Sequence, residues 1–337
     1  MHDESRQEEI IQGRKDSASQ KDLKICQEEL SIAGGDGSPV SAYHWHDSQK
    51  TTPAAVVQVV HGMAEHAMRY KETAEFLVSQ GFHVLANDHR GHGKTAHGKI
   101  PGHYSDMNGW ELIFHDLTAV RGKINSLYPD CPVFMLGHSM GSFMTMQYMQ
   151  TRGQDLCGVI LSGSNYIPAT LAKSMRFIPW LEAKRQGRHG KSWLVDYLSF
   201  GSFNKPFKPN RTSFDWLSRD ATQVDQYILD PMCGFRCTNQ LWLDFLGGLG
   251  QIFDPAHLKK IPADLPVLII GGSRDPISKV SGLKKLQKSF LKAGISKTEC
   301  EILPDCRHEI LNETNRREIQ EKLARWLQKQ LRARILH

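Results

Sequence analysis

A short motif, Gly137-His138-Ser139-Met140-Gly141, places a serine between two glycines in the order G-x-S-x-G. An apolar run at 132–136 precedes the motif, and a methionine-rich run of helix-forming residues follows it. This order predicts a tight strand-to-helix turn in which the serine backbone is strained and its Oγ projects from the edge of a sheet. Gly137 and Gly141 are expected because a side chain there would strike the adjoining strand or helix. Ser139 is therefore the candidate nucleophile, and an idle serine in a glycine-rich turn is the alternative.

A serine hydroxyl needs a base that takes its proton, and the base needs an acid that fixes its tautomer. Both residue types follow Ser139 in the order Asp, then His. Asp275 comes after the apolar run in LPVLIIGGSRDPIS, and His308 lies in LPDCRHEILNE. Asp275 could instead cap a helix, and His308 could be an idle surface group. Asp305 is the rival acid, although it lies only three residues before the histidine.

The reaction would also need two backbone N–H groups that point at one oxygen. Met140, directly after the candidate nucleophile, supplies one. The loop His61-Gly62-Met63-Ala64-Glu65-His66 is expected to supply the other through Met63, because Gly62 lets the chain turn sharply. We interpret His61 as a buried structural histidine, since a base at both 61 and 308 would be superfluous.

Expected strands and helices alternate from about residue 22. Strands are expected at 23–32, 42–46, 54–60, 82–87, 132–136 and 158–161, with helices at 70–80 and 110–127. The alternation resumes after about 256, with strands at 265–270 and 298–303, a helix at 278–293, and a last helix ending near 332. This rhythm predicts an α/β fold with a mostly parallel sheet and helices on both faces.

The middle of the chain breaks this rhythm. Residues 166–256 contain no strand pattern and are rich in Trp, Phe, Pro and basic residues. We therefore expect a helical cap inserted after the sixth strand. The predicted organisation is a polar, disordered tail over residues 1–21, an α/β core over 22–165 and 257–337, and the cap over 166–256.

Composition and cysteine count favour a cytoplasmic enzyme. Of the 337 residues, 40% are hydrophobic and 23% are charged, as in ordinary globular proteins. No apolar run approaches the roughly 18 residues that span a bilayer, and the amino terminus lacks the apolar stretch of a secretory signal. Seven cysteines, an odd number in a long chain, indicate reduced thiols. The histidines at 89, 92, 97 and 103 lie in a glycine-rich run, so no metal and no cofactor are expected.

The positive charge of the chain is concentrated in the expected cap. Residues 173–215 hold nine Lys and Arg against three acidic residues, which accounts for the whole net charge of +6. Apolar clusters at 175–181 and 193–200 lie beside these charges. A solvated basic face is one interpretation. Peripheral contact with an anionic membrane surface, or with a phosphate-bearing lipid, is the other. No nucleic-acid motif is present, so no nucleic-acid partner is expected.

Four motifs together resemble a known group of enzymes. They are HGMAEHAMRY at 61–70, NDHRGHGKT at 87–95, GHSMGS at 137–142 and RHEILNE at 307–313. The chain resembles α/β-hydrolases of the monoacylglycerol lipase and bacterial lysophospholipase group. The resemblance implies a nucleophile, an acid, a base and two oxyanion donors at Ser139, Asp275, His308, Met63 and Met140. Ser142 in place of a second glycine and Thr95 in place of a serine depart from the group's pattern.

The expected activity is hydrolysis of a single-acyl glycerolipid through an acyl-enzyme. The substrate would be a lysophospholipid or a monoacylglycerol, and the basic cap favours the lysophospholipid. Methionines at 140, 144, 146 and 149 are candidates to line an acyl pocket. A general small-ester carboxylesterase, a serine peptidase of the same fold and a catalytically silent binding scaffold remain as alternatives.

Overall fold

The computed structural model describes residues 23–335, so the expected tail over residues 1–21 lies outside the described residues. Eight strands form one sheet in the order β1-β2-β4-β3-β5-β6-β7-β8. Their bounds are β1 Ile25–Ala33, β2 Pro39–Asp47, β3 Val56–Val60, β4 His83–Asn87, β5 Val133–His138, β6 Gly158–Ser162, β7 Val267–Gly272 and β8 Thr298–Leu303. Only the β1–β2 and β2–β4 pairs are antiparallel. The mostly parallel α/β sheet is therefore confirmed.

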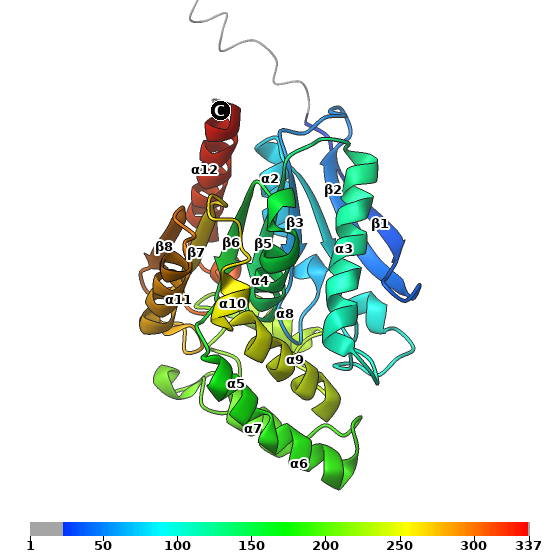
Figure 1. The fold of residues 1–337 in the computed structure, drawn as a ribbon, viewed down its shortest axis with the longest axis vertical. Coiled ribbons are helices and arrows are strands. Elements are labelled where there is room, and N and C mark those ends of the chain that lie inside the picture. The colour runs from blue at the N-terminus through cyan, green and yellow to red at the C-terminus, as the bar shows by residue number, and fades with distance from the viewer. Residues whose placement is uncertain (1–22, 336–337) are drawn as a thin grey trace, which may run out of the picture.

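Helices cover both faces of the sheet, because alternate strand residues point to opposite sides (Figure 1). On β3, Val56 and Val60 pack with one face, whereas Val57 and Val59 pack with the other. The first face is covered by α3 Gly109–Leu127, α4 Met140–Arg152 and α11 Lys279–Ala293. The second is covered by α2 Lys71–Ser79 and α12 Arg316–Ile335. Short 3-10 helices are η1 Ala67–Tyr70, η2 Gly93–Ala96, η3 Gly153–Asp155, η4 Lys205–Phe207 and η5 Ile310–Asn312.

A helical insertion, residues 163–266, separates β6 from β7 and contains no strand. Its helices are α5 Ala169–Met175, α6 Phe177–Gln186, α7 Trp193–Phe200, α8 Ala221–Leu229, α9 Asn239–Ile252 and α10 Pro255–Leu258. In Figure 1, α5, α6 and α7 form the end of the molecule beyond α9. The insertion after the sixth strand is thus confirmed. Its division from the core at 166 and 256 stays a prediction, since the core cluster continues into α9 through Leu241 and Leu249.

All seven cysteines are free thiols in the structure. Within residues 23–335, no helix combines the length and apolar character needed to cross a bilayer.

Candidate active site

Ser139 occupies a strained turn between β5 and α4. Its φ of 51° and ψ of −119° lie in a region that non-glycine residues seldom adopt. A Cβ on Gly141 would lie 2.1 Å from the carbonyl oxygen of Val60, and one on Gly137 would lie 2.4 Å from Thr145 Oγ1. Neither position has room for a side chain. The glycines therefore allow the turn that presents Ser139 at the carboxyl end of a parallel strand, where sites on such sheets gather.

Asp275 and His308 form a buried pair at the same edge of the sheet. Asp275 follows β7, His308 follows β8, and His308 Nδ1 lies 2.9 Å from Asp275 Oδ2. The aspartate also accepts hydrogen bonds from Ser278 Oγ at 2.6 Å and from the N–H of Ile277 at 2.8 Å. Because the carboxylate only accepts, it fixes the His308 tautomer with the proton on Nδ1 and leaves Nε2 as the basic nitrogen.

The pKa shifts of the pair follow from this contact. Burial acts to raise the pKa of Asp275, but the charge and hydrogen bond of His308 outweigh burial, and the pKa lies below its usual value. Burial acts to lower the pKa of His308, but the charge and hydrogen bond of Asp275, together with the charges of Glu309 and Glu65, raise this pKa above its usual value. The rival acid Asp305 lies elsewhere, with its backbone N–H bonded to Ser273 Oγ at 2.9 Å. Asp275, rather than Asp305, contacts the imidazole.

Ser139 and His308 line one cavity of about 100 Å³. Gly163, at the end of β6, makes room for the imidazole, because a Cβ there would lie 3.0 Å from His308 Cε1. Among residues 23–335, Ser139 Oγ has no hydrogen-bond partner, so Ser139 and His308 share a cavity without a hydrogen bond between them. Such nucleophile–base bonds often tighten only when substrate is bound.

Two backbone N–H groups beside Ser139 are free to bind an anion. Met140 is the first residue of α4, where helix N–H groups lack intrahelical acceptors and the helix dipole favours negative charge. In the β3–η1 loop (residues 61–66), Glu65 Oε1 accepts the N–H of Gly62 at 2.5 Å. The next N–H, that of Met63, has no acceptor among the described residues. Met63, Met140 and Ser139 line a common cavity.

His61 is fully buried and is held from both ring nitrogens. Nδ1 lies 2.8 Å from the carbonyl oxygen of Gly62, and Nε2 accepts the N–H of His89 at 3.0 Å. Burial, helped by the neighbouring histidines, lowers the pKa of His61 well below its usual value. These contacts agree with the interpretation of His61 as a structural residue.

Sequence reasoning missed a buried charge network beneath this site. Arg69 is bonded to both carboxylate oxygens of Glu309, through Nη2 at 2.7 Å to Oε2, and to Glu65 Oε2 at 3.0 Å. Despite burial, Arg69 lowers the pKa of Glu309 to about 2. Since Glu65 accepts the N–H of Gly62 and Glu309 follows His308, Arg69 links the β3–η1 loop to the loop that contains His308. Glu65 and Arg69 belong to the HGMAEHAMRY motif, but no pattern linked them to Glu309.

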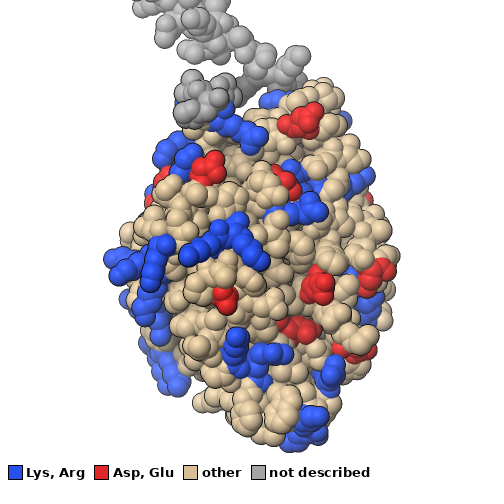
Figure 2. Space-filling view, viewed as in Figure 1, with Lys and Arg blue, Asp and Glu red and all other residues tan. Residues whose placement is uncertain are grey.

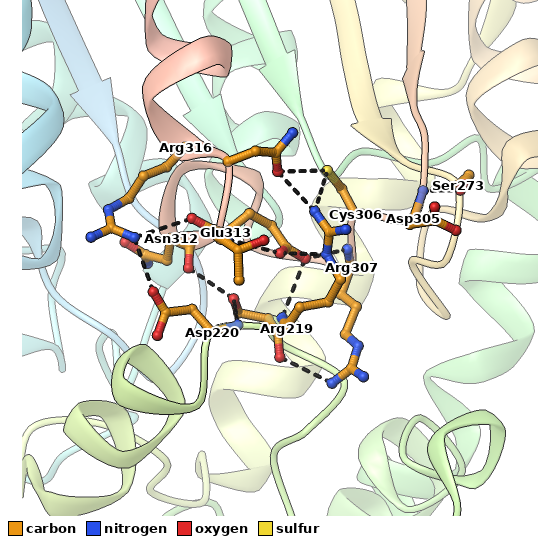
Figure 3. A network of polar contacts seen from close by, with 12 residues as sticks. Arg219, Asp220, Ser273, Asp305, Cys306, Arg307, Asn312, Glu313 and Arg316 are labelled. Atoms are coloured by element: carbon orange, nitrogen blue, oxygen red, sulfur yellow. Dashed lines mark hydrogen bonds and ion pairs between the residues drawn. The ribbon is translucent and has the colours of Figure 1, made fainter.

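No pattern in the sequence predicts that the insertion forms hydrogen bonds to the β8–α12 loop (residues 304–315). An inner segment of the insertion, residues 215–220, lies along this loop (Figure 3). Arg219 Nε donates to Glu313 Oε2 at 2.8 Å, and the same carboxylate accepts the N–H of Arg307 at 2.7 Å. The N–H of Glu309 donates to the carbonyl oxygen of Leu217 at 2.7 Å. His308 is therefore held between its own loop and the insertion.

The insertion also holds the β3–η1 loop through hydrogen bonds. The carbonyl oxygen of Ala64 accepts hydrogen bonds from Tyr227 Oη at 3.0 Å and from the N–H of Gly234 at 2.9 Å. Ala64 has a φ of 55°, a conformation that is costly for alanine. Two donors from the insertion thus stabilise the strained residue next to Met63.

Two cavities meet at Ser139. The larger, of about 480 Å³, has mainly aliphatic and aromatic walls, and among residues 23–335 Lys279 is the only charged residue that lines it. The smaller, of about 100 Å³, also contains His308, and its charged side chains are all acidic: Glu65, Asp196 and Glu309. Of the four methionines expected around an acyl pocket, Met140 lines the larger cavity. Met144, Met146 and Met149 are buried in the core cluster.

Comparison with known proteins gives a consistent family relationship. Residues 51–315 match the family described as serine aminopeptidase, S33. The monoacylglycerol lipase of Mycolicibacterium smegmatis is 27% identical over 300 residues, which cover 89% of this chain and 96% of that protein. The monoglyceride lipase of Rattus norvegicus is 28% identical over 262 residues, or 77% of each chain. A carboxyl esterase of Bacillus coagulans, solved with glycerol, superposes with a TM-score of 0.80 at 28% identity, over 91% of this chain and all of that one.

Proposed function

The chain belongs to the serine aminopeptidase S33 family of α/β-hydrolases, and on that premise we propose that it hydrolyses the ester bond of a monoacylglycerol. The enzyme is a serine ester hydrolase of the monoacylglycerol lipase group. The observation that carries the substrate proposal is the position of Ser139 between two unequal cavities. The larger, mainly apolar cavity suits an acyl chain, and the smaller cavity with acidic side chains suits the alcohol that leaves.

In the proposed mechanism, Ser139 is the nucleophile, His308 the base and Asp275 the acid. Nε2 of His308 takes the proton of Ser139 as Oγ bonds to the ester carbonyl carbon. The N–H groups of Met63 and Met140 donate to the carbonyl oxygen, which becomes anionic. The ester C–O bond then breaks, and the alcohol leaves with the proton from His308. Water repeats the sequence, so that the fatty acid is released and Ser139 regains its proton.

The charge of the small cavity favours an uncharged alcohol. Glu65, Asp196 and Glu309 line it, and no basic side chain does. Arg69, bonded to Glu65 and Glu309, and Arg236, 3.5 Å from Asp196, neutralise part of this charge from outside the cavity. A phosphate head group would therefore lose its hydration without finding a cation. The basic residues that favoured a lysophospholipid in the sequence do not line this cavity.

A substrate panel tests the proposal. We expect kcat/KM for a long-chain monoacylglycerol to exceed that for the lysophosphatidate of the same chain by at least about 10-fold, or roughly 1.4 kcal/mol. Equal or higher activity on the phosphate-bearing lipid would contradict the assignment of the alcohol. The family description makes aminoacyl p-nitroanilides the right comparison for a peptidase. Faster cleavage of these amides than of any ester would contradict ester hydrolysis as the main activity and would indicate a peptidase.

We also propose that the outer helices of the insertion contact an anionic membrane surface. Exposed large apolar residues gather on α5, α6 and α7, among them Met175, Phe177, Trp180, Leu181, Trp193 and Leu198. Basic residues accompany them, and Figure 2 shows blue side chains among tan ones at this end of the molecule. An exposed apolar patch bordered by Lys and Arg is typical of interfacial binding. This contact would give a lipid substrate direct access to the apolar cavity, which Met175 and Leu198 also line.

Vesicle binding checks this contact. We expect the protein to sediment with phosphatidylserine-containing vesicles, more weakly at high salt, and Trp180→Ala to reduce binding several-fold. Leu229→Ala is the control, because Leu229 is an apolar residue even more exposed than Trp180 but lies on α8, outside this patch. Equal loss in both variants, or binding independent of vesicle charge, would contradict the proposal.

A further inference from the structure

A cluster of two histidines and one aspartate joins the core to the insertion, away from the residues assigned to the reaction. His103 and Asp106 lie in the segment between η2 and α3, and His189 lies in the turn between α6 and α7. His189 Nε2 is 2.5 Å from Asp106 Oδ1, and His103 Nε2 is 3.4 Å from the same oxygen. The two imidazole rings meet edge to face, with centroids 4.6 Å apart. Three side chains that are common metal ligands therefore point at one position.

The tautomer of His103 follows from its second nitrogen. His103 Nδ1 lies 3.1 Å from Thr238 Oγ1, which is buried and donates its only proton to the carbonyl oxygen of Gly102 at 3.0 Å. Thr238 can then only accept from His103, so Nδ1 carries the proton. Nε2 of a neutral His103 presents a lone pair toward Asp106. A lone pair that faces a carboxylate is unfavourable unless a cation lies between them.

We propose that His103, Asp106 and His189 bind a divalent transition-metal ion of the zinc type. Zinc bonds to nitrogen and carboxylate oxygen are about 2.0–2.2 Å, which places tetrahedral ligands about 3.3 Å apart. The His103–Asp106 distance of 3.4 Å matches this value, and the exposed His189 must withdraw from its 2.5 Å contact by less than 1 Å. The hydrogen bond from His103 to Thr238 is the kind of outer contact that orients metal-binding histidines.

Two other groups of potential ligands fit a metal less well. His66, Asp230 and Cys233 also converge, but the cationic Arg69 lies close by and would repel a metal ion. In the group of Glu28, His44 and His46, the two imidazole rings are stacked nearly parallel, at 12°. Stacked rings direct their nitrogens side by side rather than toward one point.

An ion at the proposed site would fasten the insertion to the core. The surrounding contacts already join the same elements, since Arg188 Nη1 donates to the carbonyl oxygen of Asp106 at 3.0 Å. The N–H of Thr238, just before α9, likewise donates to the carbonyl oxygen of Gly102 at 2.8 Å. The sequence did not predict this site, because His189 lies far along the chain from the histidine-rich run that contains His103.

Calorimetric titration of the full chain with Zn²⁺ under reducing conditions tests the proposal. We expect the wild type to bind one ion at this site and His189→Gln to bind it at least about 100-fold more weakly, since loss of an outer-shell contact alone costs roughly 10–100-fold. Asp106→Asn should have a similar effect. Both side chains are exposed, so the substitutions should leave the fold intact. His46→Gln is the matched control, because it alters one of the other histidine groups and should keep the wild-type affinity.

A second readout separates this site from adventitious binding to thiols. Co²⁺ bound by His and Asp in a tetrahedral site gives visible absorption without the sulfur-to-metal band of cysteine ligation. We expect that spectrum in the wild type and in His46→Gln, and its loss in His189→Gln. Equal Zn²⁺ affinity in the wild type and His189→Gln, or a Co²⁺ spectrum dominated by sulfur, would overturn the proposal. Neither result depends on catalytic activity.

Discussion

The candidate nucleophile and the candidate base are held by different kinds of structure. Ser139 is positioned within the core, since Gly137 lets β5 approach α4 and Gly141 lets α4 approach the carbonyl oxygen of Val60 on β3. His308 is positioned by partners far along the chain, because Leu217 and Arg219 of the insertion bond to its loop. The β3–η1 loop, which contains Met63, is likewise held by the insertion, since Tyr227 and Gly234 donate hydrogen bonds to Ala64. Substitutions of the catalytic residues in the core should therefore abolish hydrolysis. Substitutions in the insertion should instead shift the catalytic groups and lower the rate.

The largest effect is expected inside the core. Asp275→Asn should lower kcat by about 10⁴-fold, because an asparagine favours the wrong tautomer of His308. The rate of hydrolysis of a short p-nitrophenyl ester measures this loss, and circular dichroism shows whether the variant folds. Asp305→Asn is the matched control and should retain near wild-type activity. A larger loss in Asp305→Asn than in Asp275→Asn would reverse the assignment of the acid.

Removing the Arg219–Glu313 contact between the insertion and the β8–α12 loop should have an intermediate effect on the rate. Arg219→Ala removes the cation bonded to Glu313, which is fully buried, so the β8–α12 loop should shift. Misplacement of a catalytic group by about 1 Å can cost up to about 100-fold in rate. We expect a fall in kcat with little change in KM, and partial rescue by Arg219→Lys.

Arg211→Ala is the control for that variant, because Arg211 bonds to Asp225 within the insertion and not to the loop of His308. A similar fall in kcat for both arginine variants would mean that general loosening of the insertion, and not the Arg219–Glu313 contact, is responsible.

A smaller loss of activity is expected from a substitution that loosens the β3–η1 loop. Tyr227→Phe removes one of the two donors to the Ala64 carbonyl oxygen and keeps the ring that packs on Arg69. A hydrogen bond of this kind contributes about 0.5–1.5 kcal/mol, which corresponds to roughly 2–10-fold in kcat. Steady-state kinetics on the short ester would detect it. An unchanged kcat would show that Gly234 alone suffices to hold the loop.

The mildest prediction concerns pH. His308 acts as a base only when it is neutral, and Asp275 raises its pKa. The acid limb of kcat/KM should therefore lie above the usual histidine pKa of about 6.5, and activity should fall as the pH drops through it. In Asp275→Asn, the residual activity should have its acid limb at lower pH. If the acid limb of Asp275→Asn lay at the same pH as that of the wild type, the observed titration would not be that of His308.

The same contrast explains what could be predicted from the sequence. The turn at Ser139 and the parallel strands have local signatures, in glycine spacing and β-branched runs, and both were foreseen. The brace from Arg219 to Glu313 joins residues 94 positions apart and leaves no periodic pattern. The basic segment was visible, but whether its charges lined a cavity or faced outward depended on how α5 to α7 pack. The preference for a lysophospholipid rested on that basic segment and stays a prediction.

The most direct test of the account is the reactivity of Ser139 itself. Treatment of the full chain with a fluorophosphonate, followed by peptide mass spectrometry, should place a single label on Ser139. Ser139→Ala should be neither labelled nor active on a short ester while remaining folded. Ser289→Ala, on the surface-facing part of α11, should be labelled like the wild type. Label on a different serine, or undiminished hydrolysis by Ser139→Ala, would contradict the central claim that Ser139 is the nucleophile.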